Sequence, residues 1–194
     1  MDATPDPASA AQALLREFQE KFAVDEVPPV PVERIATSLL NLIIEEADDL
    51  RLLPGAPSEH GLLSGMIDPA NLTIWVDGRE SERSPRRRRF TIAHEIGHWQ
   101  LHVPGSDGAI MFDRPEDISD VDVHTEALPA LRRREAEANA FARELLLPER
   151  LVRDQAKRSG CNLSALAARF DVSVPAIRLR LLTLGLLPAW MRKQ

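Results

Sequence analysis

Five consecutive residues near the middle of the chain have the types and the spacing required for metal-assisted hydrolysis. They read His94-Glu95-Ile96-Gly97-His98, with two histidines four positions apart. Residues four apart lie on the same face of a helix, so His94 and His98 can present two imidazole nitrogens to one metal ion. Glu95 lies beside them, where a carboxylate can take a proton from water that the metal activates. The motif therefore predicts a hydrolytic metal site that needs a third ligand.

A catalytic zinc site takes three protein ligands and leaves one position open for water. The other histidines and nearby carboxylates are the candidates for the third ligand: His60, His102, His124, Glu126, Glu135, Glu137 and Glu144. His102 follows His98 by four residues, but three successive helical turns extend about 11 Å along the axis. Bonds of about 2.1 Å cannot reach one ion from all three histidines. We therefore interpret His102 as a packing residue or as part of a cleft wall.

Glu135 is the best placed of the carboxylates, because Asn139 follows it by one helical turn. A carboxylate can bind the metal while an amide four residues later orients a histidine ring. Glu137 points about 200° away from Glu135 on an ideal helix, so only one of the two can be the ligand. The spacing favours Glu135 but leaves Glu137 as the alternative.

The elements that must position these residues are predicted from apolar periodicity and from turn residues. The motif helix begins near residues 86–90 and ends at His102, before Pro104-Gly105, and the Glu135 helix covers residues 132–147. Other helices are predicted at 8–22, 32–40, 148–159, 163–170 and 174–184, a strand at 42–46, and a hairpin from 61–68 and 71–77. Residues 50–60, 77–85 and 103–131 are predicted loops, the last with one short strand and a length suited to shaping a substrate cleft.

Composition and charge limit the classes of function. The chain has 194 residues, 44% of them hydrophobic and 28% charged, which is typical of one globular core. Residues 150–194 hold nine basic and two acidic residues, a formal charge of +7, which leaves −13 for residues 1–149 because the whole chain carries −6. The single Cys161 excludes an intrachain disulfide, and the acidic N-terminus lacks the pattern of a signal peptide. No apolar run approaches membrane-spanning length, so we predict a cytoplasmic protein with no membrane partner.

Two stretches together resemble the ImmA/IrrE family of metallo-endopeptidases: 87–98, which contains the motif, and 135–148. The resemblance spans about residues 30–187. It implies that His94, His98 and Glu135, the last followed by Asn139 in an E-x-x-x-N context, bind zinc, with manganese in some members. It also implies that Glu95 is the general base. The family typically cleaves helix-turn-helix transcriptional repressors, which implies a protein substrate and a role in stress response and transcription regulation.

The developing oxyanion in peptide hydrolysis needs a donor besides the metal. The chain contains no tyrosine, so the candidates are His60, His102, His124 or an arginine of residues 103–134. Gly97 costs about 1 kcal/mol relative to alanine inside a helix, so it is predicted to mark a close backbone approach. The strand at 71–77 is predicted either to pair with an extended substrate or to serve only as scaffold.

These observations predict an α+β fold. A small antiparallel sheet would pack on a zincin-like helix pair, followed by a C-terminal helical bundle that resembles a helix-turn-helix. We divide the chain into an N-terminal tail and helix (1–30), a metallopeptidase core (31–148) and a C-terminal helical part (149–194). Within 163–181, Ser173 is the predicted N-cap of a second helix, and the basic tail makes DNA or protein binding by a transcriptional regulator the alternative function. The start of that helix, Val174-Pro175-Ala176, offers no side chain that could read a base through two hydrogen bonds.

Overall fold

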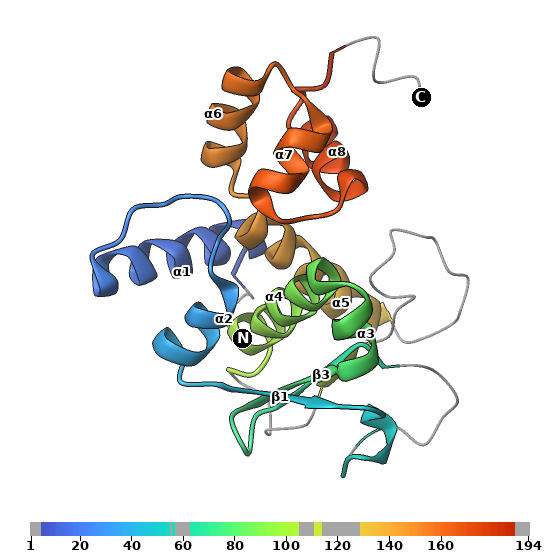
Figure 1. Cartoon of the computed structure of the whole chain (residues 1–194). Helices are drawn as coiled ribbons and strands as arrows, with labels where there is room; N and C mark the ends of the chain where they lie inside the picture. Colours follow the sequence, from blue (N-terminus) through green and yellow to red (C-terminus); the bar gives the residue numbers. More distant parts are fainter. Residues whose placement is uncertain (1–4, 55, 57–62, 105–110, 114–128, 189–194) are drawn as a thin grey trace.

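The computed structural model describes residues 5–54, 56, 63–104, 111–113 and 129–188. Two helices at the centre pack against each other: α4 (Pro85–Leu101) and α5 (Pro129–Leu146). In Figure 1 the sheet lies on one side of α4, and the C-terminal helices gather at the opposite end of the molecule. α1 (Pro7–Phe22) packs on α5, so that α5 is held between α1 and α4. The predicted pair of motif helix and Glu135 helix is thus present.

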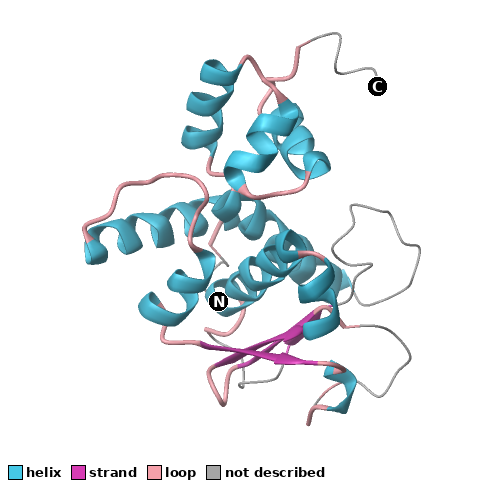
Figure 2. Cartoon of the chain, in the orientation of Figure 1, coloured by secondary structure: helices cyan, strands magenta, loops and turns pink. Residues whose placement is uncertain are grey.

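Among the described residues the sheet has four strands in the order β1-β3-β2-β4, with the bounds β1 (Ile43–Ala47), β2 (Gly65–Asp68), β3 (Thr73–Asp77) and β4 (Met111–Asp113). Figure 2 shows the strands in magenta, below the central helices. β2 pairs antiparallel with β3, as the predicted hairpin requires, and antiparallel with β4. β1 pairs parallel with β3, so the sheet is mixed rather than wholly antiparallel. Because β3 has a neighbour on both sides, the prediction that this strand could pair with a substrate is wrong, and the scaffold alternative holds.

α4 is buried on all sides over two turns in its middle. Every residue from Thr91 to His98 is buried, which includes the polar residues of the motif. Pro85 occupies the first turn, where a missing N–H costs nothing because that group has no partner within the helix. At Gly97 a Cβ atom would lie 3.1 Å from the backbone oxygen of Ala138 and 3.2 Å from its Cα. The predicted close approach at Gly97 is confirmed, and the backbone that approaches belongs to α5.

The C-terminal part forms three helices close to their predicted limits: α6 (Glu149–Ser159), α7 (Leu163–Phe170) and α8 (Val174–Thr183). The hydroxyl of Ser173 accepts a hydrogen bond from the backbone N–H of Ala176 at 3.2 Å, which confirms the predicted N-cap of α8. Leu166, Phe170 and Ile177 are buried and belong to the same hydrophobic core as α1, α4 and α5.

The remaining described elements are short: α2 (Val32–Arg34) continues as the π-helix η1 (Ile35–Leu39), and η2 (Leu50–Leu52) is a 3₁₀ turn. The loop predicted at 77–85 is wrong, because it contains the helix α3 (Gly78–Arg83), which packs on α4 and β3. This segment has no apolar periodicity, and the Ser81 hydroxyl supports its first turn by donating to the Asp77 carbonyl at 2.9 Å. Among the described helices, none combines the length and the apolar character that crossing a membrane requires.

Candidate metal centre

The contact between α4 and α5 brings together the predicted ligands from two distant parts of the chain. His94 and His98 lie one turn apart on α4, and Glu135 lies on the facing side of α5. The two histidines are 0% and 1% exposed, and Glu135 is 9% exposed. A buried cluster of polar side chains is costly unless its members satisfy one another or bind an ion. The absence of a side chain at Gly97 lets the two helices approach closely at this level.

The three predicted ligands present their atoms at distances that suit a tetrahedral metal ion. The Nε2 atoms of His94 and His98 are 3.0 Å apart. The Glu135 carboxylate lies 3.2 Å from His94 Nε2 through Oε2 and 3.3 Å from His98 Nε2 through Oε1. Ligand atoms on a tetrahedral zinc with bonds of about 2.0–2.1 Å are separated by about 3.3–3.4 Å. The residues present therefore fit the metal in both donor chemistry and spacing.

The two carboxylates that the sequence left as alternatives have different partners in the structure. Glu135 faces His94 and His98, whereas Glu137 contacts His102 Nε2 at 3.1 Å and accepts from Arg133 at 2.7 Å. Of the two carboxylates, Glu135 is therefore the one on the side of α5 that faces the two histidines. Its role as a metal ligand stays a prediction.

Asn139 lies behind His94, one turn after Glu135 on α5. Its amide oxygen is 3.1 Å from Nδ1 of His94. Because an amide oxygen only accepts, Nδ1 carries the proton and Nε2 keeps the lone pair that a metal ligand requires. The structure thus places Asn139 where the sequence predicts it, next to a histidine of the motif.

Burial and hydrogen bonding set the charge state of the cluster. Burial lowers the pKa of His98 to about 4, against a smaller opposing effect of Glu135, so the ring is neutral at pH 7. Burial raises the pKa of Glu135, but the contacts of its carboxylate with the His94 and His98 rings outweigh burial and bring the pKa to about 2. A neutral imidazole beside an ionised carboxylate is the state in which these groups bind a metal.

Glu95, the predicted base, is 0% exposed, and its carboxylate lies against β2. A Cβ atom at Gly65 of β2 would lie 2.5 Å from Oε1 of Glu95 and 2.5 Å from Cγ2 of Thr91. β2 therefore passes this close to the base only because residue 65 has no side chain. Gly65 is not among the residues predicted for the site, although a glycine within a strand can signal the close approach of another group.

His102 is a predicted oxyanion donor, and that role stays a prediction. Its Nδ1 lies 3.0 Å from Nδ1 of His98, and its Nε2 faces Glu137. Both ring nitrogens therefore have protein partners, His98 and Glu137. The other candidates His124, His60 and Glu126 lie outside the described residues.

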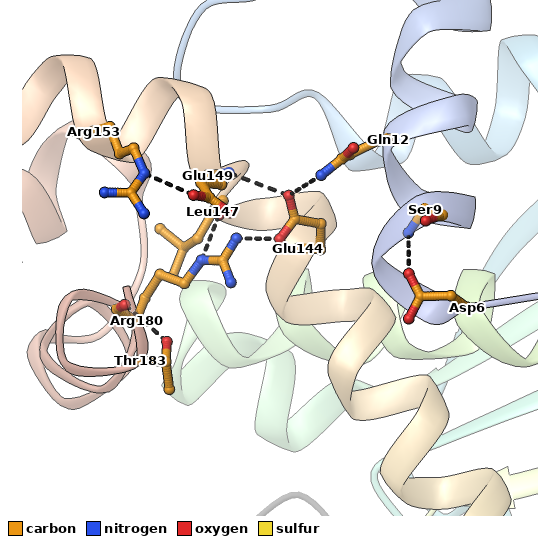
Figure 3. Close-up of polar contacts among 9 residues, drawn as sticks. All are labelled: Asp6, Ser9, Gln12, Glu144, Leu147, Glu149, Arg153, Arg180 and Thr183. Carbon is orange, nitrogen blue, oxygen red and sulfur yellow. Dashed lines mark hydrogen bonds and ion pairs between the residues drawn. The ribbon is translucent and has the colours of Figure 1, made fainter. Parts of the chain in front are cut away.

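Glu144 was a candidate ligand and lies elsewhere in the core. Its carboxylate accepts from Gln12 Nε2 at 3.0 Å and from the backbone N–H of Glu149 at 3.2 Å, and it forms an ion pair with Arg180 (Figure 3). Glu144 thus joins α1, α6 and α8 to α5, at a distance of two and a half helical turns from Glu135. It does not belong to the group formed by His94, His98 and Glu135.

Comparison with known proteins agrees with this geometry. Residues 78–182 match the peptidase family described as the IrrE N-terminal-like domain. The chain is 27% identical over 172 residues to the radiation response metalloprotease IrrE of Deinococcus radiodurans, covering 87% of this chain and 45% of that protein. Its fold is similar to that of a Mycobacterium tuberculosis transcriptional regulator, with a TM-score of 0.57, 19% identity, and coverage of 89% and 46%. The chain spans about half the length of these relatives.

Proposed function

The chain belongs to the peptidase family of the IrrE N-terminal-like domain, and we propose that it is a zinc-dependent endopeptidase that hydrolyses a peptide bond in one regulatory protein. The observation that carries the proposal is the buried convergence of His94, His98 and Glu135 within 4.8 Å of one another. Two imidazole nitrogens and a carboxylate are ligands that suit zinc, and manganese is the alternative metal.

A divalent metal held by these three groups would polarise the scissile carbonyl and lower the pKa of a water molecule. Glu95 takes the proton from the attacking water and transfers it to the leaving amine. Gly65 and Thr91 limit the space that the Glu95 carboxylate occupies, since a Cβ atom at residue 65 would meet both Glu95 Oε1 and Thr91 Cγ2. Asn139 keeps the His94 ring in the orientation that directs Nε2 toward Glu135.

The proposed substrate is a helix-turn-helix transcriptional repressor, as the resemblance to the ImmA/IrrE family implies. An extended segment of such a protein could add to an edge of the sheet, where main-chain groups have no neighbouring strand. Within the described part of the chain the edges are β1 and β4. β4 pairs with β2, the strand that contacts Glu95, so it is the edge nearer to the proposed base.

The proposal is tested by metal content and by cleavage. Protein purified without added metal should contain one zinc ion per chain, and it should cut a repressor encoded close to its own gene while leaving casein intact. A chelator should abolish cleavage, and zinc should restore it. His94→Ala should lose both the metal and the activity. A wild-type protein that binds neither zinc nor manganese would refute the proposal.

A DNA-binding regulator is the second candidate, because α7 and α8 form a helix pair joined by three residues in the basic part of the chain. Two contacts count against it. Asp171, in the connection, pairs with Arg86 at 3.3 Å and with Arg89 at 3.4 Å, both on α4. Arg180 of α8 is directed inward, at Glu144 and at the Leu147 carbonyl. These groups hold the helix pair against the core and are not available to DNA.

One pair of variants separates the two functions. Glu95→Gln keeps size and hydrogen bonding but removes the base, so it should preserve zinc binding and lower the cleavage rate by a factor of about 10² to 10⁴. Arg169→Ala combined with Arg178→Ala removes positive charge from α7 and α8 and should leave cleavage unchanged. A Glu95→Gln protein with full biological effect, beside an inactive arginine variant that has lost salt-dependent DNA binding, would favour the regulator.

A further inference from the structure

His102, the residue that follows the last turn of α4, contacts a proposed ligand on one side and a carboxylate on the other. Its Nδ1 lies 3.0 Å from Nδ1 of His98, and its Nε2 lies 3.1 Å from Oε2 of Glu137. Glu137 is held in turn by Arg133, whose Nε donates to Oε1 at 2.7 Å. The side chains of His102 and Glu137 are only 4% and 18% exposed. Four side chains from α4 and α5 therefore form a continuous chain of hydrogen bonds that ends at His98.

The carboxylate at the end of this chain determines where the protons lie. An ionised carboxylate can only accept, so Nε2 of a neutral His102 ring carries a proton and donates it to Glu137. Nδ1 of the same ring then has no proton and can only accept. The 3.0 Å contact between the two rings therefore makes Nδ1 of His98 the donor.

This arrangement leaves the lone pair of His98 on Nε2, the atom that faces Nε2 of His94 and the Glu135 carboxylate. These three groups then direct their lone pairs at one point, which is favourable when a metal ion is bound there. The reverse arrangement would aim an unprotonated Nε2 of His102 at Glu137, which places a lone pair against a negative charge. It would also protonate Nε2 of His98 and remove its ability to bind a metal.

We propose that His102 and Glu137 are positioning residues that hold His98 in the tautomer and the ring orientation of a metal ligand. Asn139 has the corresponding contact with His94, so each proposed histidine ligand has its own support. Such supports fix the ring and raise the basicity of the ligand nitrogen. Glu135 and Glu137 thus serve the same site in different ways, one facing the metal position and the other facing His102. The inference rests on the metal site proposed above.

The test combines zinc affinity, measured by competition with a chromophoric chelator, and the tautomer of His98, measured by ¹⁵N NMR of the metal-free protein. His102→Phe keeps an aromatic ring without its nitrogens and should weaken zinc binding about 10- to 100-fold. Glu137→Ala should weaken it in the same direction, and in both variants His98 should shift toward the Nε2–H tautomer. His102→Asn keeps an acceptor near the position of Nδ1 and should recover most of the affinity.

The double variant His102→Phe/Glu137→Ala should bind zinc no more weakly than His102→Phe alone, because the two residues act in one chain of contacts. Gln100→Ala, on the same turn of α4, is the control and should leave affinity and tautomer unchanged. An unchanged zinc affinity and His98 tautomer in His102→Phe, with a lowered melting temperature, would overturn the inference and leave His102 a packing residue. If the wild type bound no metal, the proposed function would fail instead, while the NMR measurement would still report whether His102 sets the tautomer.

Discussion

At the scale of single residues, Gly65 gives the proposed base its position. A side chain at this point would meet Oε1 of Glu95 and Cγ2 of Thr91, each 2.5 Å from the Cβ position. The glutamate carboxylate is the end of a flexible side chain, whereas the threonine methyl is fixed by branching at Cβ. A methyl group added at residue 65 would therefore displace the Glu95 carboxylate rather than Thr91.

We expect Gly65→Ala to lower kcat by about 10²-fold with only a small change in stability. Alanine in a strand stabilises the folded state by roughly 0.5–1 kcal/mol relative to glycine. Overpacking destabilises it by about 1–3 kcal/mol, so the two effects on the free energy of unfolding partly offset each other. Steady-state kinetics and urea denaturation measure the two effects. Gly78→Ala is the matched control, because its Cβ would meet its nearest neighbour at 3.6 Å. Full activity of Gly65→Ala would show that β2 does not constrain Glu95.

At the scale of elements, the distance between α4 and α5 fixes the spacing of the proposed ligands. Gly97 is the contact point, and its neighbours are the backbone of Ala138 at 3.1 and 3.2 Å and the ring of Phe141 at 3.2 Å. Backbone atoms of α5 can yield only if the whole helix moves. Glu135 and Asn139 lie on the same helix, on either side of Ala138, and would move with it.

Gly97→Ala should therefore weaken zinc binding by about 10-fold, even though alanine is the better helix former by about 1 kcal/mol. Chelator competition measures the affinity, and thermal unfolding of the metal-free protein measures the stability. Gly78→Ala again serves as the comparison, since it adds the same methyl group far from this contact. Wild-type affinity in Gly97→Ala would mean that α5 tolerates the added methyl without displacing Glu135.

At the scale of the whole molecule, the Glu144–Arg180 ion pair ties the C-terminal helices to the helix that carries Glu135. The side chains of Glu144 and Arg180 are 4% and 14% exposed, so the pair is buried. Arg180 also donates to the Leu147 carbonyl at 2.9 Å, at the end of α5 (Figure 3). Removing one partner leaves the other charge buried, which is the costly way to break such a pair.

Arg180→Ala should destabilise the protein by about 3 kcal/mol, the lower end for a broken buried pair, because Glu144 retains Gln12 and the Glu149 N–H as donors. Urea denaturation measures the change. Arg153→Ala removes an exposed pair with Glu149 at 2.7 Å, four residues apart, and should cost no more than about 0.5 kcal/mol. Equal effects of the two variants would show that the C-terminal helices are not anchored through Arg180.

Local rules were sufficient for the central motif and for the long helices, but not for α3, which the sequence predicted as a loop. The spacing of His94 and His98 places them on one face of α4, and Ser173 caps α8. Prolines and glycines predict the ends of most elements to within a few residues of the observed bounds. These features depend on neighbours within about one helical turn, which the sequence displays directly. The division of the chain at residues 30 and 148 stays a prediction.

Contacts between distant segments were decided by the tertiary structure. β1 pairs with one edge of β3 and β2 with the other, and the packing of α4 on α5 places Glu135 beside the two motif histidines and Glu137 beside His102. Residues 98 and 102 contact each other within one helix, but the proton arrangement between them depends on a carboxylate 35 positions away. Sequence periodicity gives the direction of a side chain on its own helix, whereas the partner it meets depends on how closely and at what angle the helices pack.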